Sequence, residues 1–383
     1  MRCIYMTWKK YCVDLLGLSL IVIVAYIIPA EWVRHRLNEV YVGDDIAIDM
    51  QLNENALYGS ALMEDICFLK YGMISRTEPD IIALGTSRSM QFRAAFFKGA
   101  TFYTTGGMGD SIDAMEAIFD HICINYVPKI VIFAVDWDWL NPNYPHPKLR
   151  YVENNTLTYR AYLYQSLYQE IWRNQNVREQ LIQPNIKERD LVGNRPTIGL
   201  MAGGKSSGFR QDGSYQYGDG ILHPQSTEVN FEDTHQRIRD GNKRFERADH
   251  IDEDELLKLT AFIQKMQKRG THVLVVLPPF PNEIYQTLMA SEGHRAFILQ
   301  FEDAVRSLCV VQDVPFYDFT NMAWLGASDE EAFDGFHASE RTYGRITLQF
   351  EIDPVIAPYI NKDFIEQCMV NSDHPYQIIP ADM

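Results

Sequence analysis

Residues 81–91 read IIALGTSRSMQ, an apolar run followed by a glycine and then by two serines that flank an arginine. The apolar run predicts a short strand buried on both faces, and the small polar residues after it predict a tight strand-to-helix turn. Such a turn has two interpretations. Either Ser87 or Ser89 caps the following helix, or Ser87 is presented at the end of the strand as a nucleophile.

From about residue 80 the chain alternates short apolar runs with helical patterns, which is typical of a parallel sheet with crossover helices. We therefore expect an α/β fold. The predicted strands are Asp80–Leu84, Thr101–Thr105, Lys129–Val135, Thr271–Leu277 and Val314–Phe319. The predicted helices are a short one over Arg88–Phe97, Ser111–Tyr126 capped by Asp110, Asp254–Arg269 capped by Asp252, Glu283–Leu308 with a break near Gly293, and Ser339–Phe350.

An insertion at about residues 141–253 interrupts this rhythm after the third strand. Residues 157–180 form a tyrosine-rich helical pattern, and GFRQDGSYQYGDG at 208–220 predicts a glycine-bounded hairpin or loop. The insertion leaves the carboxyl ends of the strands, where ligands bind in open α/β sheets, so we expect it to cover the site.

The N-terminal segment carries the compartment signal. Lys9 and Lys10 precede LLGLSLIVIVAYIIPA, residues 15–30, an apolar run of about membrane-spanning length. We predict that residues 1–32 are an uncleaved membrane anchor with a cytoplasmic N-terminus and an extracytoplasmic remainder. Cleavage after Ala30, which would release a secreted protein, and a buried helix remain open. Residues 33–79 are assigned to a juxtamembrane segment and residues 80–383 to the main domain.

Composition excludes several classes of protein. A formal charge of −16 argues against nucleic acid as a partner, because phosphate binding needs clustered Lys and Arg. The six cysteines include no CxxC pair, which excludes a zinc ribbon or thioredoxin-type site and leaves only a Cys67–Cys368 bridge open. Asp136, Asp138 and His121 have no evident metal-binding partners. We therefore predict no metal and no cofactor.

Residues 199–206, GLMAGGKS, formally match a phosphate-binding P-loop. That loop needs a strand before it and a helix after it, so that backbone amides and a helix N-terminus face the phosphates. The flanking sequence predicts neither element. A flexible glycine loop is the better interpretation.

Residues 331–346, EAFDGFHASERTYGRI, contain the second chemical signal. Asp334 and His337 are separated by two residues in a glycine-containing turn, so the carboxylate can hold one ring nitrogen while the other acts as a general base. Ser87 supplies the nucleophile that this pair lacks. We predict a Ser87–His337–Asp334 triad, with the Ser87 N–H as one oxyanion donor.

At this point the chain resembles the SGNH (GDSL-like) hydrolase superfamily. Gly85-Thr86-Ser87 is similar to its first block and Asp334-Gly335-Phe336-His337 to its last. TTGGMGDSID, residues 104–113, is similar to the second and implies that Gly109 is an oxyanion donor. The resemblance covers about residues 80–140 and 270–350, and it implies a three-layer, flavodoxin-like fold with a five-stranded parallel sheet.

The third block departs from the family. Where the family has Gly-x-Asn-Asp, this chain has AVDWDWLN at 134–141. Asp136 and Trp137 occupy the expected positions, and a carboxylate donates to an oxyanion only when it is protonated. Asp136, Trp137 and Arg88 are candidates for contact with substrate, and Arg88 would pair with an anionic group or form a surface salt bridge.

The anchor and the divergent third block resemble one branch of the superfamily, the D-alanine-transfer (DltD-like) and alginate O-acetylation proteins. This likeness implies an acyl-serine intermediate and hydrolysis or O-acyl transfer on a cell-envelope or exported polysaccharide, beside a membrane-bound O-acyltransferase. The competing hypothesis is a non-catalytic envelope protein that binds glycan or docks such an acyltransferase.

Overall fold

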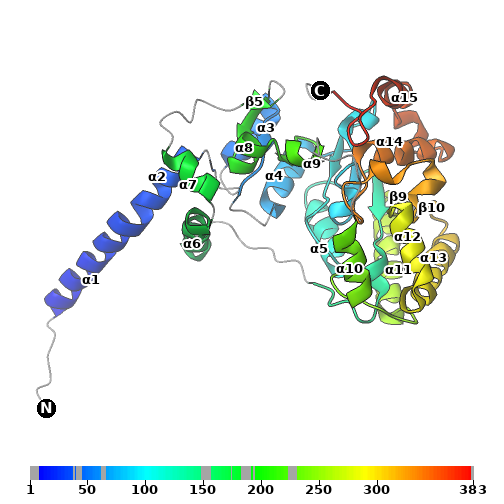
Figure 1. The fold of residues 1–383 in the computed structure, drawn as a ribbon, viewed down its shortest axis with the longest axis horizontal. Coiled ribbons are helices and arrows are strands. Elements are labelled where there is room, and N and C mark those ends of the chain that lie inside the picture. Colours follow the sequence, from blue (N-terminus) through cyan, green and yellow to red (C-terminus); the bar gives the residue numbers. More distant parts are fainter. Residues whose placement is uncertain are drawn as a thin grey trace, which may run out of the picture.

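The computed structural model describes residues 8–37, 39, 45–61, 66–147, 157–173, 175–182, 191–192, 195–222 and 231–380. Figure 1 shows a long N-terminal helix at one end, an α/β domain at the other, and a smaller group of helices and short strands between them. The predicted α/β class is confirmed.

The α/β domain is built on five parallel strands, as predicted. Numbered by their order in the chain, they lie in the sheet as 2-1-3-4-5, which is a doubly wound order. The order reverses between β2 and β4, and ligands of open α/β sheets bind beyond the carboxyl ends of the strands at such a point. The strands are β2 (Ile81–Leu84), β3 (Phe102–Thr104), β4 (Ile130–Ala134), β9 (His272–Leu277) and β10 (Phe316–Asp318), in the spatial order β10-β9-β4-β2-β3.

Helices cover both faces of this sheet. Ile82 and Leu84 of β2 belong to one hydrophobic core, whereas Ile81 and Ala83 belong to the other, as the alternation of side chains along a strand requires. The domain is therefore a three-layer arrangement. The first face is covered by α4 (Cys67–Thr77), α5 (Ile112–Ile122), α11 (Glu253–Lys268), α12 (Asn282–Ala290) and α13 (Glu292–Gln312), and the second by α14 (Glu340–Gln349) and α15 (Lys362–Asn371).

Several local predictions are corrected by the structure. The N-cap of α5 is Ser111, whose Oγ accepts from the Ala114 amide, and not Asp110. Asp252 caps α11 as predicted. The break between α12 and α13 falls at Ser291. The short helix expected after Ser87 is replaced by two 3-10 turns, η2 (Ser87–Ser89) and η3 (Ala94–Phe96), so no α-helix begins at Ser87.

A second, smaller sheet is formed by strands from two segments that were predicted to be separate, residues 33–79 and the insertion. Strand β1 (Leu57–Tyr58) comes from the region assigned to the juxtamembrane segment, yet it pairs with β6 (Arg195–Ile198) and β7 (Gly208–Phe209) of the insertion. Helix α4 from the same region belongs to the core of the α/β domain. The sheet is completed by β5 (Leu191–Val192) and β8 (Tyr215–Gln216), and the predicted hairpin is the antiparallel pair β7 and β8.

Residues 199–206 are not a flexible loop. Strand β6 precedes them, and α8 (Leu200–Lys205) occupies the motif itself rather than following it. The amides at its start are taken by other groups: Leu200 N donates to Glu39 Oε1, and Met201 N and Ala202 N donate to Gly59 O. No phosphate cradle forms. The insertion also contains α6 (Leu157–Arg173), α7 (Gln175–Ile182), α9 (Asp219–Leu222) and α10 (Glu232–Asp240).

The cysteine bridge left open by the sequence does not form. Cys67 lies in the core on one face of the main sheet and Cys368 in the core on the other. Both are present as thiols, and Cys3 lies outside the described residues.

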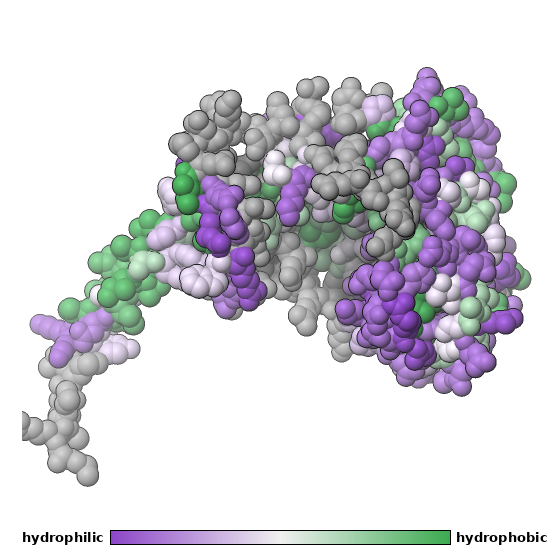
Figure 2. Space-filling view, in the orientation of Figure 1, coloured by the Kyte–Doolittle hydropathy of each residue, from purple (hydrophilic) through white to green (hydrophobic). Residues whose placement is uncertain are grey.

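The N-terminal helix is continuous from Trp8 to Arg36 through α1 (Trp8–Val22), a π-helical turn η1 (Ile23–Ile27) and α2 (Ile28–Arg36). It is long and apolar enough to cross a membrane or to serve as a signal sequence. Figure 2 shows apolar surface concentrated along this helix, whereas the visible face of the α/β domain is mostly hydrophilic.

The insertion hairpin docks onto the α/β domain through buried charges. Asp212 of the hairpin accepts from Arg93 Nε at 3.3 Å and from the Ala94 amide at 2.9 Å, and Arg93 also pairs with Glu340 of α14. Lys70 of α4 is fully buried and donates to the carbonyls of Thr104, Gly106 and Gly213 at 2.7–3.0 Å. Three segments distant in sequence therefore meet at one ammonium group.

Lys70 gives the fold a specific dependence on pH. Burial lowers its pKa to about 7, although Asp212 raises it. Between that value and about pH 10 the unfolded chain binds more protons than the folded chain, so the contribution of Lys70 to stability rises with pH. The difference in unfolding free energy between wild type and Lys70→Met should increase by about 2 kcal/mol from pH 7 to pH 9.

Urea unfolding of the full chain in detergent micelles at the two pH values measures this difference. Lys98→Met, which removes an exposed lysine, is the matched control and should show no such trend. A difference for Lys70→Met that stays flat or decreases would contradict the assignment.

Candidate active site

The turn after β2 is shaped by Gly85 and Thr86. A Cβ on Gly85 would lie 2.8 Å from Ala134 Cβ of β4, so only glycine lets the turn pass this close to the neighbouring strand. Thr86 Oγ1 accepts from the Arg88 amide at 3.3 Å and donates to Asp136, the second residue after β4. The turn is thereby fixed to the end of the adjacent strand.

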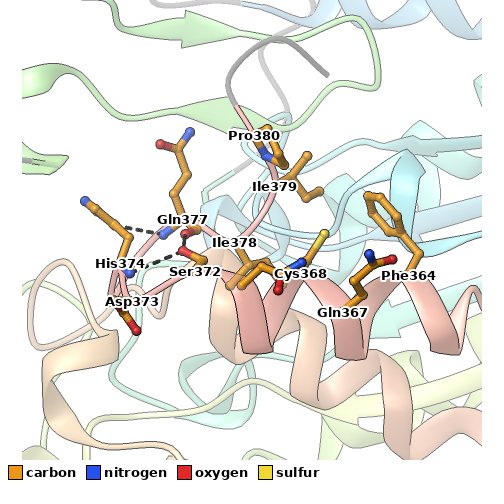
Figure 3. A pocket seen from close by; sticks show the side chains of 11 residues that line it. Phe364, Gln367, Cys368, Ser372, Asp373, His374, Gln377, Ile378, Ile379 and Pro380 are labelled. Carbon is orange, nitrogen blue, oxygen red and sulfur yellow. Dashed lines mark hydrogen bonds between the residues drawn. The ribbon is translucent and has the colours of Figure 1, made fainter.

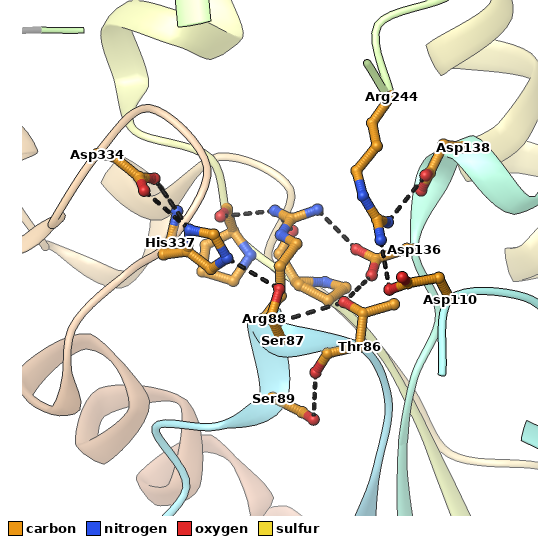
Figure 4. Close-up of polar contacts among 12 residues, drawn as sticks. Thr86, Ser87, Arg88, Ser89, Asp110, Asp136, Asp138, Arg244, Asp334 and His337 are labelled. Atoms are coloured by element: carbon orange, nitrogen blue, oxygen red, sulfur yellow. Dashed lines mark hydrogen bonds and ion pairs between the residues drawn. The ribbon is translucent and has the colours of Figure 1, made fainter. Parts of the chain in front are cut away.

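The two serines of this turn have different surroundings. Ser89 is buried, and its Oγ donates to the Thr86 carbonyl at 2.9 Å, which is a structural contact. Ser87 is partly exposed, and its Oγ lies 2.9 Å from His337 Nε2 (Figure 4). Of the two hydroxyls, that of Ser87 is the one beside a base.

His337 is oriented by Asp334, as the spacing predicted. His337 Nδ1 lies 2.9 Å from Asp334 Oδ2, and Asp334 Oδ1 accepts from the Phe336 and His337 amides, both at 2.7 Å. An ionised carboxylate can only accept, so Nδ1 carries the proton and the lone pair of Nε2 faces Ser87. The structure thus brings together all three residues of the predicted triad (Figure 4).

Asp334 stays ionised although part of it is shielded from water. Burial raises the pKa of its carboxyl, but the hydrogen bond and charge of His337 and the two backbone amides outweigh this and lower the pKa below its ordinary value. An anion at this position stabilises the imidazolium that forms when His337 takes a proton.

Arg88 does not face a substrate. Its side chain is 2% exposed, and its NH1 pairs with Asp136 Oδ1 at 2.9 Å. Its NH2 donates to the carbonyls of Pro278 and Pro279 at 2.9 and 2.7 Å, and the guanidinium lies 4.2 Å from the Phe280 ring centroid. Arg88 was predicted either to pair with an anionic group of the substrate or to form a surface salt bridge. Its burial matches neither prediction.

Asp136 and Trp137 are also buried. Asp136 is fully enclosed, and both its oxygens are taken by Arg88 and Thr86. The Trp137 ring packs in the core, with centroids 5.5 Å from Phe245 and 5.8 Å from Phe280. The prediction that these two residues contact substrate does not match their burial.

The two predicted oxyanion donors lie at the ends of adjacent strands. Ser87 follows β2 and Gly109 follows β3, and these strands pair in parallel. A Cβ on Gly109 would lie 2.8 Å from Ala114 Cβ, so the turn after β3 packs closely on α5. Neither amide donates to an acceptor in the described part of the chain, which leaves both available to a ligand.

Arg244 is a residue near the site that the sequence did not single out. It follows α10 in the insertion, and its φ of +81° is rare for a residue with a side chain. Its guanidinium donates to Asp138 Oδ2 at 3.0 Å and to Asp110, and lies 5.6 Å from the Phe336 ring centroid (Figure 4). It therefore joins the turns after β3 and β4 to the loop that carries the triad histidine.

The insertion thus places a cation beside the turns after β3 and β4. Asp138 is fully buried; burial raises the pKa of its carboxyl to about 7, with Arg244 opposing and Asp136 assisting the increase. The Arg244 side chain remains 19% exposed, unlike Arg88. No feature near residue 244 in the sequence indicated this contact, because its partners lie more than a hundred residues away.

A cavity of about 650 Å³ lies elsewhere, between α15 and the segment that follows it (Figure 3). No residue of the triad lines it; its walls include Phe364, Cys368, His374 and Ile379. No cluster of three or more potential metal ligands occurs within the described ranges.

Comparison with known proteins does not assign this site. No family model matches the chain, and no curated protein is similar enough to it to count as a relative.

The structural role of Arg88 can be tested by stability. Removing one partner of a buried ion pair leaves an uncompensated charge, so Arg88→Met should reduce the unfolding free energy by about 3–5 kcal/mol. Asp136→Leu should have a similar effect, and the double variant should be less destabilised than the sum of the two. Thermal and urea unfolding measure these changes; additive effects would show that the two residues are not coupled.

Proposed function

We propose that the protein is a serine-dependent acyl-ester hydrolase or O-acyltransferase of the SGNH type, with a flavodoxin-like fold. The observation that carries the proposal is the continuous contact from Ser87 Oγ to His337 Nε2 and from His337 Nδ1 to Asp334. The strand order 2-1-3-4-5, with the nucleophile at the point where the order reverses, supports it.

The first half of the reaction forms an acyl-serine. Ser87 Oγ bonds to the acyl carbon while His337 Nε2 takes the hydroxyl proton, and the negative charge moves to the former carbonyl oxygen. The C–O bond to the leaving alcohol then breaks, and His337 returns the proton to that oxygen. In the second half, water or an acceptor hydroxyl attacks the acyl carbon and loses its proton to His337. The bond from this carbon to Ser87 Oγ then breaks, and His337 returns the proton to Oγ, which gives hydrolysis or transfer respectively.

The oxyanion is held by the amides of Ser87 and Gly109. Arg244 supplies positive charge on the side of the third block, residues 134–141. Asp136 cannot take the role of the missing asparagine, because both its oxygens accept hydrogen bonds from Arg88 and Thr86. Arg244 is the cation held beside that block, through Asp138. A fixed cation near the developing negative charge lowers the barrier because it needs no reorganisation.

The substrate we propose is an acylated or acceptor polysaccharide of the cell envelope or of an exported polymer. The support is the apolar N-terminal helix, which would tether the domain to a membrane, and the resemblance of this anchor and of the divergent third block to envelope acylation proteins. A membrane-bound O-acyltransferase is the proposed partner. Assays of acetyl release and acetyl transfer on acylated glycans, with and without such a partner, distinguish hydrolysis from transfer.

The identity of the nucleophile has a direct test. A fluorophosphonate probe should label the detergent-solubilised full chain, and Ser87→Ala should abolish labelling because it removes the hydroxyl that lies 2.9 Å from His337 Nε2. Ser89→Ala, which removes only a buried structural hydroxyl, is the matched control and should keep it. Absence of labelling in the wild type would instead favour a non-catalytic protein that binds glycan.

The contribution of Arg244 can be tested separately. Arg244→Gln should reduce the rate of acyl transfer to Ser87 by about 10²-fold, the size of effect seen when an oxyanion donor is removed. Arg244→Lys should retain more of the rate because it keeps the charge. Lys243→Gln changes the adjacent exposed residue, which has the same left-handed backbone, and should leave the rate unchanged. Equal rates for Arg244→Gln and wild type would exclude the role.

A further inference from the structure

The N-terminal helix has a defined length of apolar chain. Lys10 and Glu31 bracket Tyr11–Ala30, 20 residues in which Asp14, near the N-terminal end, is the one charged side chain. At ~1.5 Å per residue this segment is about 30 Å long, which is the thickness of the hydrocarbon core of a bilayer. If the helix spans a membrane, Glu31 therefore lies at the lipid–water boundary on the side of the globular domains.

Helix α6 of the insertion packs against the anchor helix at this level. The Tyr164 hydroxyl donates to Glu31 Oε1 at 2.7 Å, and the Tyr168 hydroxyl donates to the Tyr26 carbonyl at 2.7 Å. The Tyr26 ring contacts both tyrosine rings, with centroids 5.2–6.0 Å apart, and Leu167 is buried in the same cluster. Figure 1 shows α1 lengthwise and α6 close to end-on, so the helices cross steeply.

The contacts also define which side of α6 is directed toward the lipid. Tyr168 bonds to Tyr26, which precedes Glu31 and so lies deeper in the apolar span, whereas Tyr164 bonds to Glu31 itself. Trp172 follows Tyr168 by four residues and therefore projects from the same side of the helix. Its side chain is 85% exposed in the protein alone.

Other residues around Trp172 fit the same boundary. Trp32 of α2 is exposed beside the Arg36 guanidinium, which lies 5.7 Å from its ring centroid. Arg36 Nε donates to the Leu181 carbonyl at 3.0 Å and so fixes the end of α7, where Ile182 is exposed. Tryptophan and tyrosine concentrate at membrane interfaces, and arginine nearby can reach lipid phosphates.

We propose that α6, α7 and the end of α2 form an interfacial platform, which rests in the headgroup region of the bilayer with Trp172 inserted at the acyl boundary. The occupant of this exposed surface is lipid because the surface is continuous with the apolar span. The same insertion carries Arg244 and the hairpin that docks on the α/β domain. The platform thus connects the membrane surface to the loops around Ser87.

Fluorescence quenching by lipid tests the platform in the full chain. The protein is placed in phosphatidylcholine nanodiscs with or without bromine on the acyl chains near the headgroup. Three of the six tryptophans, Trp8, Trp32 and Trp172, lie at lipid-facing positions under the proposal, so Trp172→Phe should remove about a third of the quenchable signal. Trp324→Phe is the matched control, because this residue is 56% exposed on the α/β domain, and should remove none.

Because Trp172 is exposed, Trp172→Phe removes no core packing and the variant is expected to fold. An unchanged quenchable signal in Trp172→Phe overturns the proposal. The proposal is also overturned if Trp172 fluorescence in nanodiscs is protected from quenching by acrylamide but is not quenched by brominated lipid. That result would assign the surface to a second copy of the chain.

Discussion

The buried ion pair between Arg88 and Asp136 holds together the part of the fold that carries Ser87. Both side chains are almost completely excluded from water, and further hydrogen bonds to the remaining polar atoms offset the cost of burying such a pair; of these atoms only Arg88 Nε has no partner in the described part of the chain. Thr86 donates to the second carboxylate oxygen, and two backbone carbonyls accept from the second guanidinium nitrogen. The turn after β2 therefore has one conformation, with Ser87 directed outward toward His337.

The features that could be predicted from the sequence are those encoded locally. Each strand is a short apolar run, and the Asp334–His337 contact depends on a spacing of three residues. The features that could not be predicted depend on partners distant in the chain. Each of these features joins segments that are more than forty residues apart: the ion pair that buries Arg88, the pairing of β1 with the insertion, and the contact of Arg244 with Asp110. The sequence around Arg244 gives no local indication of its partners Asp110 and Asp138.

The insertion connects the two ends of the molecule. It packs on the N-terminal helix through α6, forms the second sheet with β1, and docks on the α/β domain through Asp212. The buried ammonium of Lys70 fixes that docking, because it bonds to the hairpin and to the turn after β3 at once. These contacts fix the position of the insertion relative to the turns around Ser87.

In the proposed function, His337 activates Ser87 for attack on an acyl carbon. Peptide mapping by mass spectrometry after timed exposure of the full chain to a small activated ester measures this attack. We expect an acyl adduct on the peptide that contains Ser87, with a rate of formation that falls by at least ~10²-fold in His337→Ala. Absence of an adduct on Ser87, or an equal rate in His337→Ala, would show that Ser87 is not a nucleophile activated by His337.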